Sequence, residues 1–353
     1  MSAPAKLPPD SSLSSSMREF AVIEKYFKAG AQAMAPRANL TEEDRASIAL
    51  GIGDDCALLA IPRNQVLAIS TDMLVEGRHF LPGANPQWLG HKALAVNLSD
   101  LAAMGAQPIA FTLALALPAA DPVWLNQFTA GLFQLAKQFN CHLIGGDTTA
   151  GPLTISITIM GQVGAGQALR RAGSKLGDDI WVSGHVGDAR LALGALRKEW
   201  SISAHALAEV LPRMHLPTPR IALGLGLRSL ASAAIDISDG LLGDLRHLLR
   251  ASQVGAVIDV STLPVSASLA QQPETIRWQC AAAGGDDYEL CFTAAPEKRE
   301  QIEALSQTLS LPLTRIGFTS ESADAAIHLL DGQGRPIDAI MAANLLRSFD
   351  HFA

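Results

Sequence analysis

Two stretches of alternating residues, FTLALAL at 111–117 and LTISITI at 153–159, decide the fold of this chain. In each stretch the bulky apolar residues occupy the odd positions, with Thr, Ser or Ala between them. Because successive side chains of a β-strand point to opposite faces, this alternation predicts two strands with one apolar face and one face of small residues. The small-residue face is suited to packing against another surface, such as a second subunit.

Strand-like and helix-like segments alternate around these two stretches. Residues 66–70 predict another buried strand, and the Ala- and Leu-rich segment 91–104, followed by Gly105, predicts a helix. The second half repeats the mixture, and its strand-like runs lie at 180–183, 233–238, 256–260 and 288–293. Such a mixture of strands and helices predicts α/β or α+β domains.

Length and local composition predict two domains and a tail. A chain of 353 residues is long enough for two domains of ordinary size. Residues 1–16 are rich in Ser and Pro, so we expect a disordered tail. The Gly-rich stretch from Gly161 to Asp179 marks the joint between the domains. We therefore expect an N-terminal domain at 17–163 and a C-terminal domain at 164–353.

The composition argues against several classes of protein. Apolar residues make up 48% of the chain and charged residues 17%, which excludes a mainly disordered protein. A net charge of −7 without a basic run argues against nucleic acid as a partner. No apolar stretch is long enough to span a membrane, and no signal peptide is visible. Four scattered cysteines without zinc-ligand spacing indicate free thiols in a cytoplasmic enzyme.

The most informative polar residues are aspartates that follow apolar runs or glycine pairs. One Asp in such a place usually forms a turn or caps a helix, but a series of them in one chain is harder to explain in that way. They are Asp54 and Asp55 in GIGDDC, Asp72 in AISTD, Asp147 in LIGGDTT, Asp236 and Asp239 in IDISDG, and Asp286 and Asp287 in GGDDYEL.

Asp100 differs from these because it lies in the middle of the predicted helix, between apolar neighbours. A carboxylate in an apolar setting needs a partner charge or a metal ion, and we prefer the metal ion. Clustered carboxylates with hydroxyl neighbours are hard oxygen ligands, which suit Mg²⁺ rather than zinc. Since Mg²⁺ is commonly held by one or two carboxylates and by phosphate oxygens, the surplus of Asp predicts several ions that bridge a polyphosphate.

The common phosphate-binding motifs are missing. There is no GxxxxGK[ST] sequence, and GIGDDC lacks the third glycine of a dinucleotide fingerprint. A bound nucleotide would therefore be held through metal ions, with Arg170 and Arg171 available for phosphate contacts. The segment IDISDGL predicts a helix start capped by Ser238 or Asp239, and the same helix N-terminus could face an anion.

Six motifs in this order resemble the thiamine-monophosphate kinase family, of the aminoimidazole ribonucleotide synthetase-like superfamily. They are GIGDDCALL, STDMLVEGRHF, KALAVNLSDLAAMGAQP, LIGGDTT, AIDISDGL and GGDDYELCFT, and the resemblance runs from about Met17 to the C-terminal FDHFA. It implies an N-terminal domain whose mixed sheet forms a barrel across a homodimer, and an α+β C-terminal domain. It also implies ATP-dependent phosphorylation of thiamine monophosphate to thiamine diphosphate, the last step of that cofactor's synthesis.

The resemblance implies roles for individual residues. The Mg²⁺ ligands would be Asp55, Asp72, Asp100, Asp147, Asp236 and Asp239, with support from Ser70 and Thr71. The ATP contacts would be Gly146, Asp147, Arg171 and Ser238. The thiamine phosphate pocket would contain His79, Asp286 and Phe349. Whether K⁺ is also required is left open.

One position departs visibly from the family pattern, and another keeps the expected aromatic ring. Asp286 stands where the family usually has Glu, so its carboxylate reaches one methylene less far, and Phe349 provides an aromatic ring without a hydroxyl. The acceptor is a phosphate monoester that is already anionic, so we expect direct in-line transfer without a general base or a covalent intermediate.

Three other interpretations stay open. Among sister enzymes, selenophosphate synthetase needs a reactive Cys where residues 1–50 have none, and the hydrogenase maturation protein ends in Cys where this chain ends FDHFA. A non-catalytic sensor of nucleotide or thiamine phosphate would have lost acidic ligands, which are all present here. A metal-dependent phosphatase would release phosphate without a second substrate.

Overall fold

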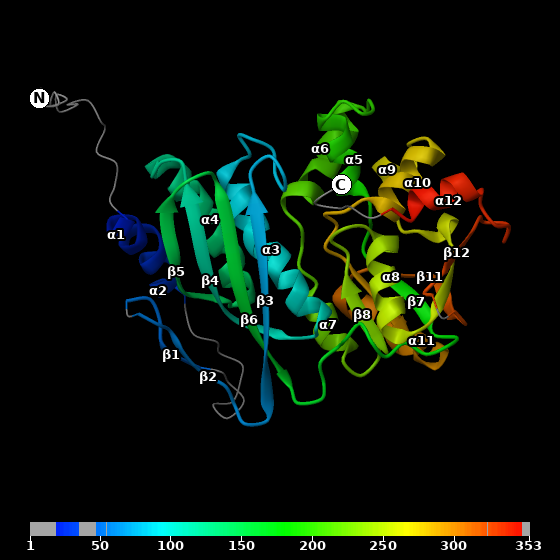
Figure 1. Cartoon of the computed structure of the whole chain (residues 1–353), viewed down its shortest axis with the longest axis horizontal. Helices are drawn as coiled ribbons and strands as arrows, with labels where there is room; N and C mark the ends of the chain where they lie inside the picture. Colours follow the sequence, from blue (N-terminus) through cyan, green and yellow to red (C-terminus); the bar gives the residue numbers. More distant parts are fainter. Residues whose placement is uncertain (1–18, 35–46, 54, 323, 348–353) are drawn as a thin grey trace, which may run out of the picture.

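A computed structural model describes residues 19–34, 47–53, 55–322 and 324–347. The tail predicted at 1–16 lies outside these residues. Each half of the described chain is built around its own mixed β-sheet, and the two halves lie side by side (Figure 1). This arrangement confirms the predicted combination of α/β and α+β architecture. The boundary after residue 163 stays a prediction.

The N-terminal half contains a short β-hairpin, a four-stranded sheet and the helices that cover it. Its elements in chain order are α1 (Glu19–Val22), the π-helical segment η1 (Ile23–Lys28), α2 (Ala29–Gln32), β1 (Ser47–Leu50), β2 (Leu58–Ala60), β3 (Gln65–Val75), α3 (Pro86–Ala103), β4 (Gln107–Leu117), α4 (Pro122–Phe139), β5 (His142–Ala150) and β6 (Thr154–Gly164).

The two alternating stretches form the middle of this sheet. Its strand order is β3-β6-β4-β5, with β4 parallel to β5 and the other pairs antiparallel. The strands predicted at 111–117 and 153–159 are confirmed in β4 and β6. The bulky side chains of both strands are buried on the face that α3 and α4 cover, so the alternation also identified the core side of the sheet.

The opposite face of the sheet is only partly covered in the single chain. β1 and β2 bring apolar residues against Ala110 and Ile144 at one end of this face. Elsewhere it carries small residues of β4 and β6, and β3 exposes apolar side chains there, including Ile69 at 61% and Met73 at 54%. This is the face on which the sequence predicts contact with another surface.

α3 is longer than the sequence indicated and lies between the two halves (Figure 1). The helix begins at Pro86 rather than near position 91, because the Asn85 side chain accepts hydrogen bonds from the backbone N–H groups of the first turn. It ends before Gly105, whose φ of +59° suits glycine. α3 packs closely on α4 at Gly90, where a Cβ atom would lie 2.0 Å from the carbonyl oxygen of Phe128.

The C-terminal half has a six-stranded sheet of order β12-β9-β11-β7-β10-β8, in which only the β12–β9 pair is parallel. Its elements are β7 (Asp179–Ser183), α5 (Asp188–Leu196), α6 (Ala204–His215), α7 (Ile221–Leu227), β8 (Ala233–Asp236), α8 (Leu241–Ser252), β9 (Gly255–Asp259), η3 (Val260–Thr262), α9 (Ala267–Ala270), α10 (Glu274–Ala283), β10 (Leu290–Ala294), η4 (Pro296–Lys298), α11 (Arg299–Leu309), β11 (Leu313–Ser320), β12 (Ile327–Leu330) and α12 (Ala339–Leu345).

None of the helices in the described ranges combines the length and the apolar character that a membrane crossing requires.

Candidate active site

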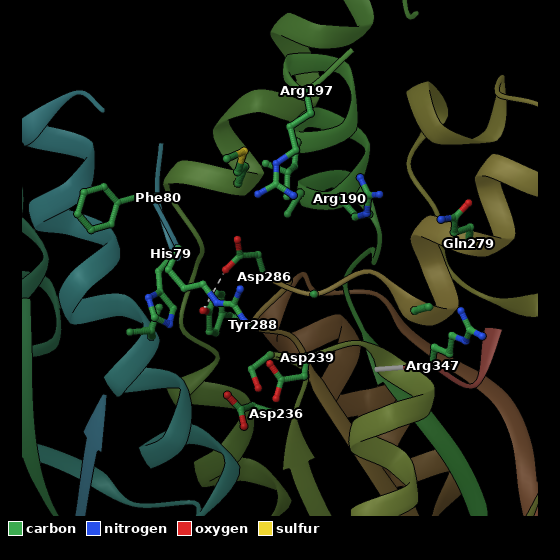
Figure 2. A pocket seen from close by; sticks show the side chains of 18 of the residues that line it. His79, Phe80, Arg190, Arg197, Asp236, Asp239, Gln279, Asp286, Tyr288 and Arg347 are labelled. Carbon is green, nitrogen blue, oxygen red and sulfur yellow. Dashed lines mark hydrogen bonds between the residues drawn. The ribbon is translucent and has the colours of Figure 1, made fainter. Parts of the chain in front are cut away.

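A cavity of about 1420 Å³ lies between the two halves of the chain. The N-terminal half contributes the end of β3, the loop that follows it, and α3. The C-terminal half contributes α5, the segment after β8, α10, the segment before β10, and α12 (Figure 2). Several of the motifs singled out in the sequence therefore meet in one place, although they are far apart along the chain.

Four aspartates of three different elements line one part of this cavity. Asp72 lies near the end of β3, Asp100 lies on α3, Asp236 is the last residue of β8, and Asp239 follows three residues later. The sequence placed these residues at strand ends and in a helix, which is confirmed. The tertiary structure adds that these elements converge.

α3 orients the carboxylates that other segments bring to the cavity. Ser99 donates a hydrogen bond of 2.7 Å to Asp236 Oδ2. The side-chain oxygen of Asn97 accepts a hydrogen bond of 3.2 Å from the backbone N–H of Asp72. Asp100 on the same helix accepts a hydrogen bond from the Ser70 hydroxyl of β3. One helix thus holds the ends of β3 and β8 in place.

These carboxylates are buried close to one another, so ionising them together is unfavourable. Burial and the negative charges of Asp100 and Asp239 raise the pKa of Asp72 to about 7. Burial and the neighbouring carboxylates, Asp100 first, raise the pKa of Asp236 to about 8, against the lowering effect of Ser99. Burial also raises the pKa of Asp100, while the Ser70 hydrogen bond and the positive charge of Arg171 act in the other direction.

The donor chemistry of this cluster suits a hard cation. Carboxylate and hydroxyl oxygens are the ligands that Mg²⁺ prefers, and a divalent cation would relieve the repulsion that raises these pKa values. Within the described ranges, however, no three His, Cys, Asp or Glu side chains are gathered closely enough to hold one metal ion by themselves.

The helix start after β8 is built differently from the sequence prediction. Neither Ser238 nor Asp239 caps α8; Gly240 occupies the cap position without a side-chain hydrogen bond. Instead, Asp244 in the first turn reaches back, and its Oδ2 accepts hydrogen bonds from the backbone N–H groups of residues 238–240. These three N–H groups, which lie just before the helix, are thus engaged by a buried carboxylate. The expectation that the helix N-terminus faces an anion stays a prediction.

The segment GGDDYEL places one carboxylate in the cavity and buries the next two acids. Asp286 and Tyr288 both have positive φ values, +70° and +51°, and the chain turns sharply between them. Asp286 therefore lines the cavity, whereas Asp287 turns inward and accepts hydrogen bonds from the backbone N–H of Gly187. His79, the other residue expected at the substrate, also lines the cavity (Figure 2).

Glu289 anchors this segment in the C-terminal half. Its side chain is 1% exposed, and its carboxylate forms ion pairs with Arg213 of α6 and with Arg220 just before α7. Ser183 of β7 donates a further hydrogen bond of 2.6 Å to the same carboxylate. Two arginines thus neutralise a buried charge three residues away from Asp286, and the hydroxyl group adds a hydrogen bond, so this segment is fixed to α6, to β7 and to the start of α7.

Arginines line the cavity as well as aspartates. In Figure 2, Arg190 of α5 and Arg197, just after α5, lie above Asp286, and Arg347 lies to the right of Asp239. Arg190 also pairs with Glu199 and lies over the ring of Trp200, 4.6 Å from its centre. A cavity lined by both carboxylates and arginines suits a ligand that carries both phosphates and bound cations.

Several residues expected at the site do not line the cavity of the single chain. Thr71 points to the other face of the sheet, where its hydroxyl lies 2.8 Å from that of Thr158. Asp147 of β5 is on that face too, because it lies level with Ala114 of β4. The other residues outside the cavity lining are Asp55, Ser70, Gly146 and Arg171, and Phe349 lies outside the described residues.

The glycine before Asp147 has a structural reason. Gly146 has a φ of +147°, and a Cβ atom on it would lie 1.9 Å from the carbonyl oxygen of Leu113 on the neighbouring strand. Only glycine fits this close approach of two strands. The glycine in LIGGDTT is therefore needed for β5 to pack against β4. Asp147, the next residue of β5, is exposed.

Sequence analysis missed the side chains that hold the site residues. They are Lys92, Ser99, Asp244, Tyr288 and Glu289. The signal for Lys92 was its position two helical turns before Asp100, on the same face of a helix otherwise rich in Ala and Leu. The partners of Glu289 lie in other segments, and no local pattern indicated them. Asp244, in contrast, accepts hydrogen bonds from N–H groups only four to six residues before it.

Comparisons with known proteins find relatives of both halves of the chain. The family models for AIR synthase related protein match residues 53–163 with the N-terminal domain and residues 175–329 with the C-terminal domain. The chain is 44% identical to thiamine-monophosphate kinase of Salmonella typhimurium over 339 residues, which is 95% of this chain and 98% of that protein.

Two solved structures are similar to the whole fold. Thiamine-monophosphate kinase from Stenotrophomonas maltophilia K279a superimposes with a TM-score of 0.79 at 44% identity, covering 90% of this chain and 97% of that one. A structure described as AaThiL complexed with AMPPCP and TMP superimposes with a TM-score of 0.70 at 27% identity, covering 96% and 100%.

We predict that Glu289→Gln lowers the free energy of unfolding by about 3 kcal/mol, because two arginines then lose the charge that neutralises them in a buried place. Urea denaturation followed by circular dichroism measures the change. Glu274→Gln is the matched control, since its side chain is 59% exposed and its pair with Arg277 contributes little. Equal stability of the two variants would contradict the anchoring role of Glu289.

Proposed function

We propose how this chain works on the premise that it belongs to the AIR synthase related family and, within it, to the thiamine-monophosphate kinases. It transfers the γ-phosphoryl group of ATP to thiamine monophosphate, which gives ADP and thiamine diphosphate. The observation that carries the proposed mechanism is the convergence of four aspartates from three elements on one end of the cavity between the halves. This end is the proposed place of phosphoryl transfer.

The aspartates at this end hold Mg²⁺ in our proposal. Asp72, Asp100, Asp236 and Asp239 each offer carboxylate oxygens, and the phosphates of the substrates supply further oxygen ligands. When bound, Mg²⁺ neutralises phosphate charge and lets two anions approach each other. The part of this chain is to hold the carboxylates in position, through Ser70, Asn97 and Ser99.

Direct in-line transfer requires no base from the protein. The acceptor oxygen belongs to a phosphate monoester, which is anionic near neutral pH, so no proton has to be removed. The residues of the chain therefore bind and align the two phosphates. Arg171 supports this role, because its positive charge acts on Asp100 and is available to an ATP phosphate beside it. Ser238 lines the same end of the cavity.

The thiamine part of the substrate lies toward His79 and Asp286 in our proposal. Both residues line the cavity, on opposite halves of the chain (Figure 2). The ring contact by Phe349 and the ATP contacts by Gly146 and Asp147 are carried over from the family resemblance. The cytoplasmic location and the domain boundary after residue 163 also remain predictions from the sequence, the latter supported by the ranges that the two family models match.

We further propose that the enzyme is a homodimer whose contact is the partly covered face of the N-terminal sheet. This face exposes apolar side chains on β3, among them Leu67, Ile69 and Met73, which a second copy would bury. Asp147 and Thr71 lie on the same face, so a second copy would also enclose two residues that the family resemblance assigns to the metal and ATP sites.

The function is tested by incubating the full chain with ATP, Mg²⁺ and thiamine monophosphate, and by separating the products. We expect equal amounts of ADP and thiamine diphosphate, no product without Mg²⁺, and no phosphorylation of free thiamine. ADP without thiamine diphosphate would indicate another acceptor or an ATPase. Free phosphate without thiamine diphosphate would indicate a phosphatase, and binding without turnover would indicate a sensor.

We predict that Asp100→Asn lowers turnover at least about 100-fold without unfolding the protein, because it removes a carboxylate from the centre of the proposed metal site. The melting temperature without Mg²⁺ should stay the same or rise, since Asp100 repels Asp72 and Asp236. Product formation and thermal unfolding measure the two effects. Asp331→Asn on the exposed β12 loop is the control, and near-normal turnover of Asp100→Asn would remove that residue from the mechanism.

We predict that the wild-type chain has twice the mass of a 37.2 kDa monomer in light scattering after size-exclusion chromatography. Ile69→Lys should dissociate it, because a charge would then lie in the apolar contact. Val123→Lys is the matched control, since Val123 is 64% exposed at the start of α4, away from the proposed contact. A monomeric wild type, or a dimer that Ile69→Lys leaves intact, would contradict the proposed interface.

A further inference from the structure

Lys92 forms an ion pair that joins the two halves of the chain at the cavity. It lies on α3 of the N-terminal half, and the residue is 2% exposed. Its ammonium group lies 2.9 Å from Asp286 Oδ2, in the segment that precedes β10. It also donates a hydrogen bond of 3.0 Å to the backbone carbonyl of Met214 at the end of α6. A buried cation is thus held between two elements of the other half.

The second oxygen of the same carboxylate has its own partner. The Tyr288 hydroxyl donates a hydrogen bond of 3.1 Å to Asp286 Oδ1 (Figure 2). The backbone of Asp286 is held as well, because its N–H donates a hydrogen bond of 2.8 Å to the carbonyl oxygen of Ser238. Lys92, Tyr288 and the backbone therefore leave this carboxylate little freedom, although its side chain remains 30% exposed.

A carboxylate fixed in this way recognises a hydrogen-bond donor. An ionised carboxylate only accepts hydrogen bonds, and its two oxygens have lone pairs to spare beyond one partner each. Thiamine monophosphate carries one N–H donor group, the amino group of its pyrimidine ring. Because Asp is short, Asp286 can meet this group only if its own position is set by the surrounding structure.

We propose that Lys92 is a positioning residue for substrate selection: with Tyr288 it holds Asp286 so that its carboxylate accepts a hydrogen bond from the pyrimidine amino group of thiamine monophosphate. The proposal rests on the proposed function, since it names how that substrate is distinguished. It assigns Lys92 no contact with the reacting phosphates. Its effect should therefore concern thiamine monophosphate and leave ATP nearly unaffected.

The test compares thiamine monophosphate with oxythiamine monophosphate, in which a carbonyl oxygen replaces the amino group. Steady-state kinetics give kcat and KM for both acceptors and KM for ATP. We expect the wild type to prefer thiamine monophosphate, and Lys92→Met to reduce this preference in kcat/KM about tenfold, the usual effect of a lost charge-assisted hydrogen bond. KM for thiamine monophosphate should rise, and KM for ATP should stay within about twofold.

Tyr288→Phe removes only one hydroxyl, so it provides a second measurement if Lys92→Met fails to fold. We expect a smaller loss of preference in the same direction, about threefold. Arg335→Gln is the control, because it removes a cation from an exposed ion pair with Asp331, outside this cavity. It should leave both the preference and the KM values unchanged.

Three results would overturn the proposal in different ways. An unchanged preference in both variants would show that Lys92 and Tyr288 do not control the amino-group contact. An equal loss for both acceptors, with a parallel change in KM for ATP, would show a purely structural role. A wild type that forms no thiamine diphosphate would contradict the proposed function, and with it the role of Lys92. An active wild type whose variants keep the same selectivity would contradict the role of Lys92 alone.

Discussion

The structure depends on one requirement: the polar side chains of α3 are buried between the two halves and need partners there. A buried polar group without a partner costs free energy, so each of these side chains must meet a group of another segment. Lys92 meets Asp286, Asn97 meets the backbone of Asp72, and Ser99 meets Asp236. One helix therefore contacts the segments of Asp72, Asp236 and Asp286, which are far apart in the chain. The cavity lies where these segments meet.

The same packing brings the carboxylates of Asp72, Asp100 and Asp236 close together, where they repel one another. Asp72 and Asp236 have pKa values near or above neutrality because burial and neighbouring carboxylates disfavour their ionised forms. The buried Glu289 shows the contrasting case, since two arginines neutralise it and give it an anchoring role. Glu289, which the arginines neutralise, anchors one side of the cavity. Asp72, Asp100 and Asp236, which repel one another, are the acids that we assign to cations.

The N-terminal sheet divides the expected site residues between its two faces. Asp72 and Ser70 lie on the side of α3, whereas Thr71 and Asp147 lie on the partly covered side. Since adjacent residues of a strand point in opposite directions, the motif STD necessarily sends its members to both faces. A single chain therefore cannot bring Thr71 and Asp147 to the same site as Asp72. The exposed face of β3 thus matters for the proposed site as well as for the proposed dimer contact.

The sequence by itself determined the strands at 111–117 and 153–159, their core face and the helix with Asp100, because these depend on local periodicity. Its ordered motifs also indicated the family. Only the tertiary structure decided that Lys92 holds Asp286, that Arg213 and Arg220 neutralise Glu289, and that Asp147 lies apart from Asp100. These relations join residues far apart in the chain, and the partner of a buried charge is set by how sheets and helices pack, which no local pattern records.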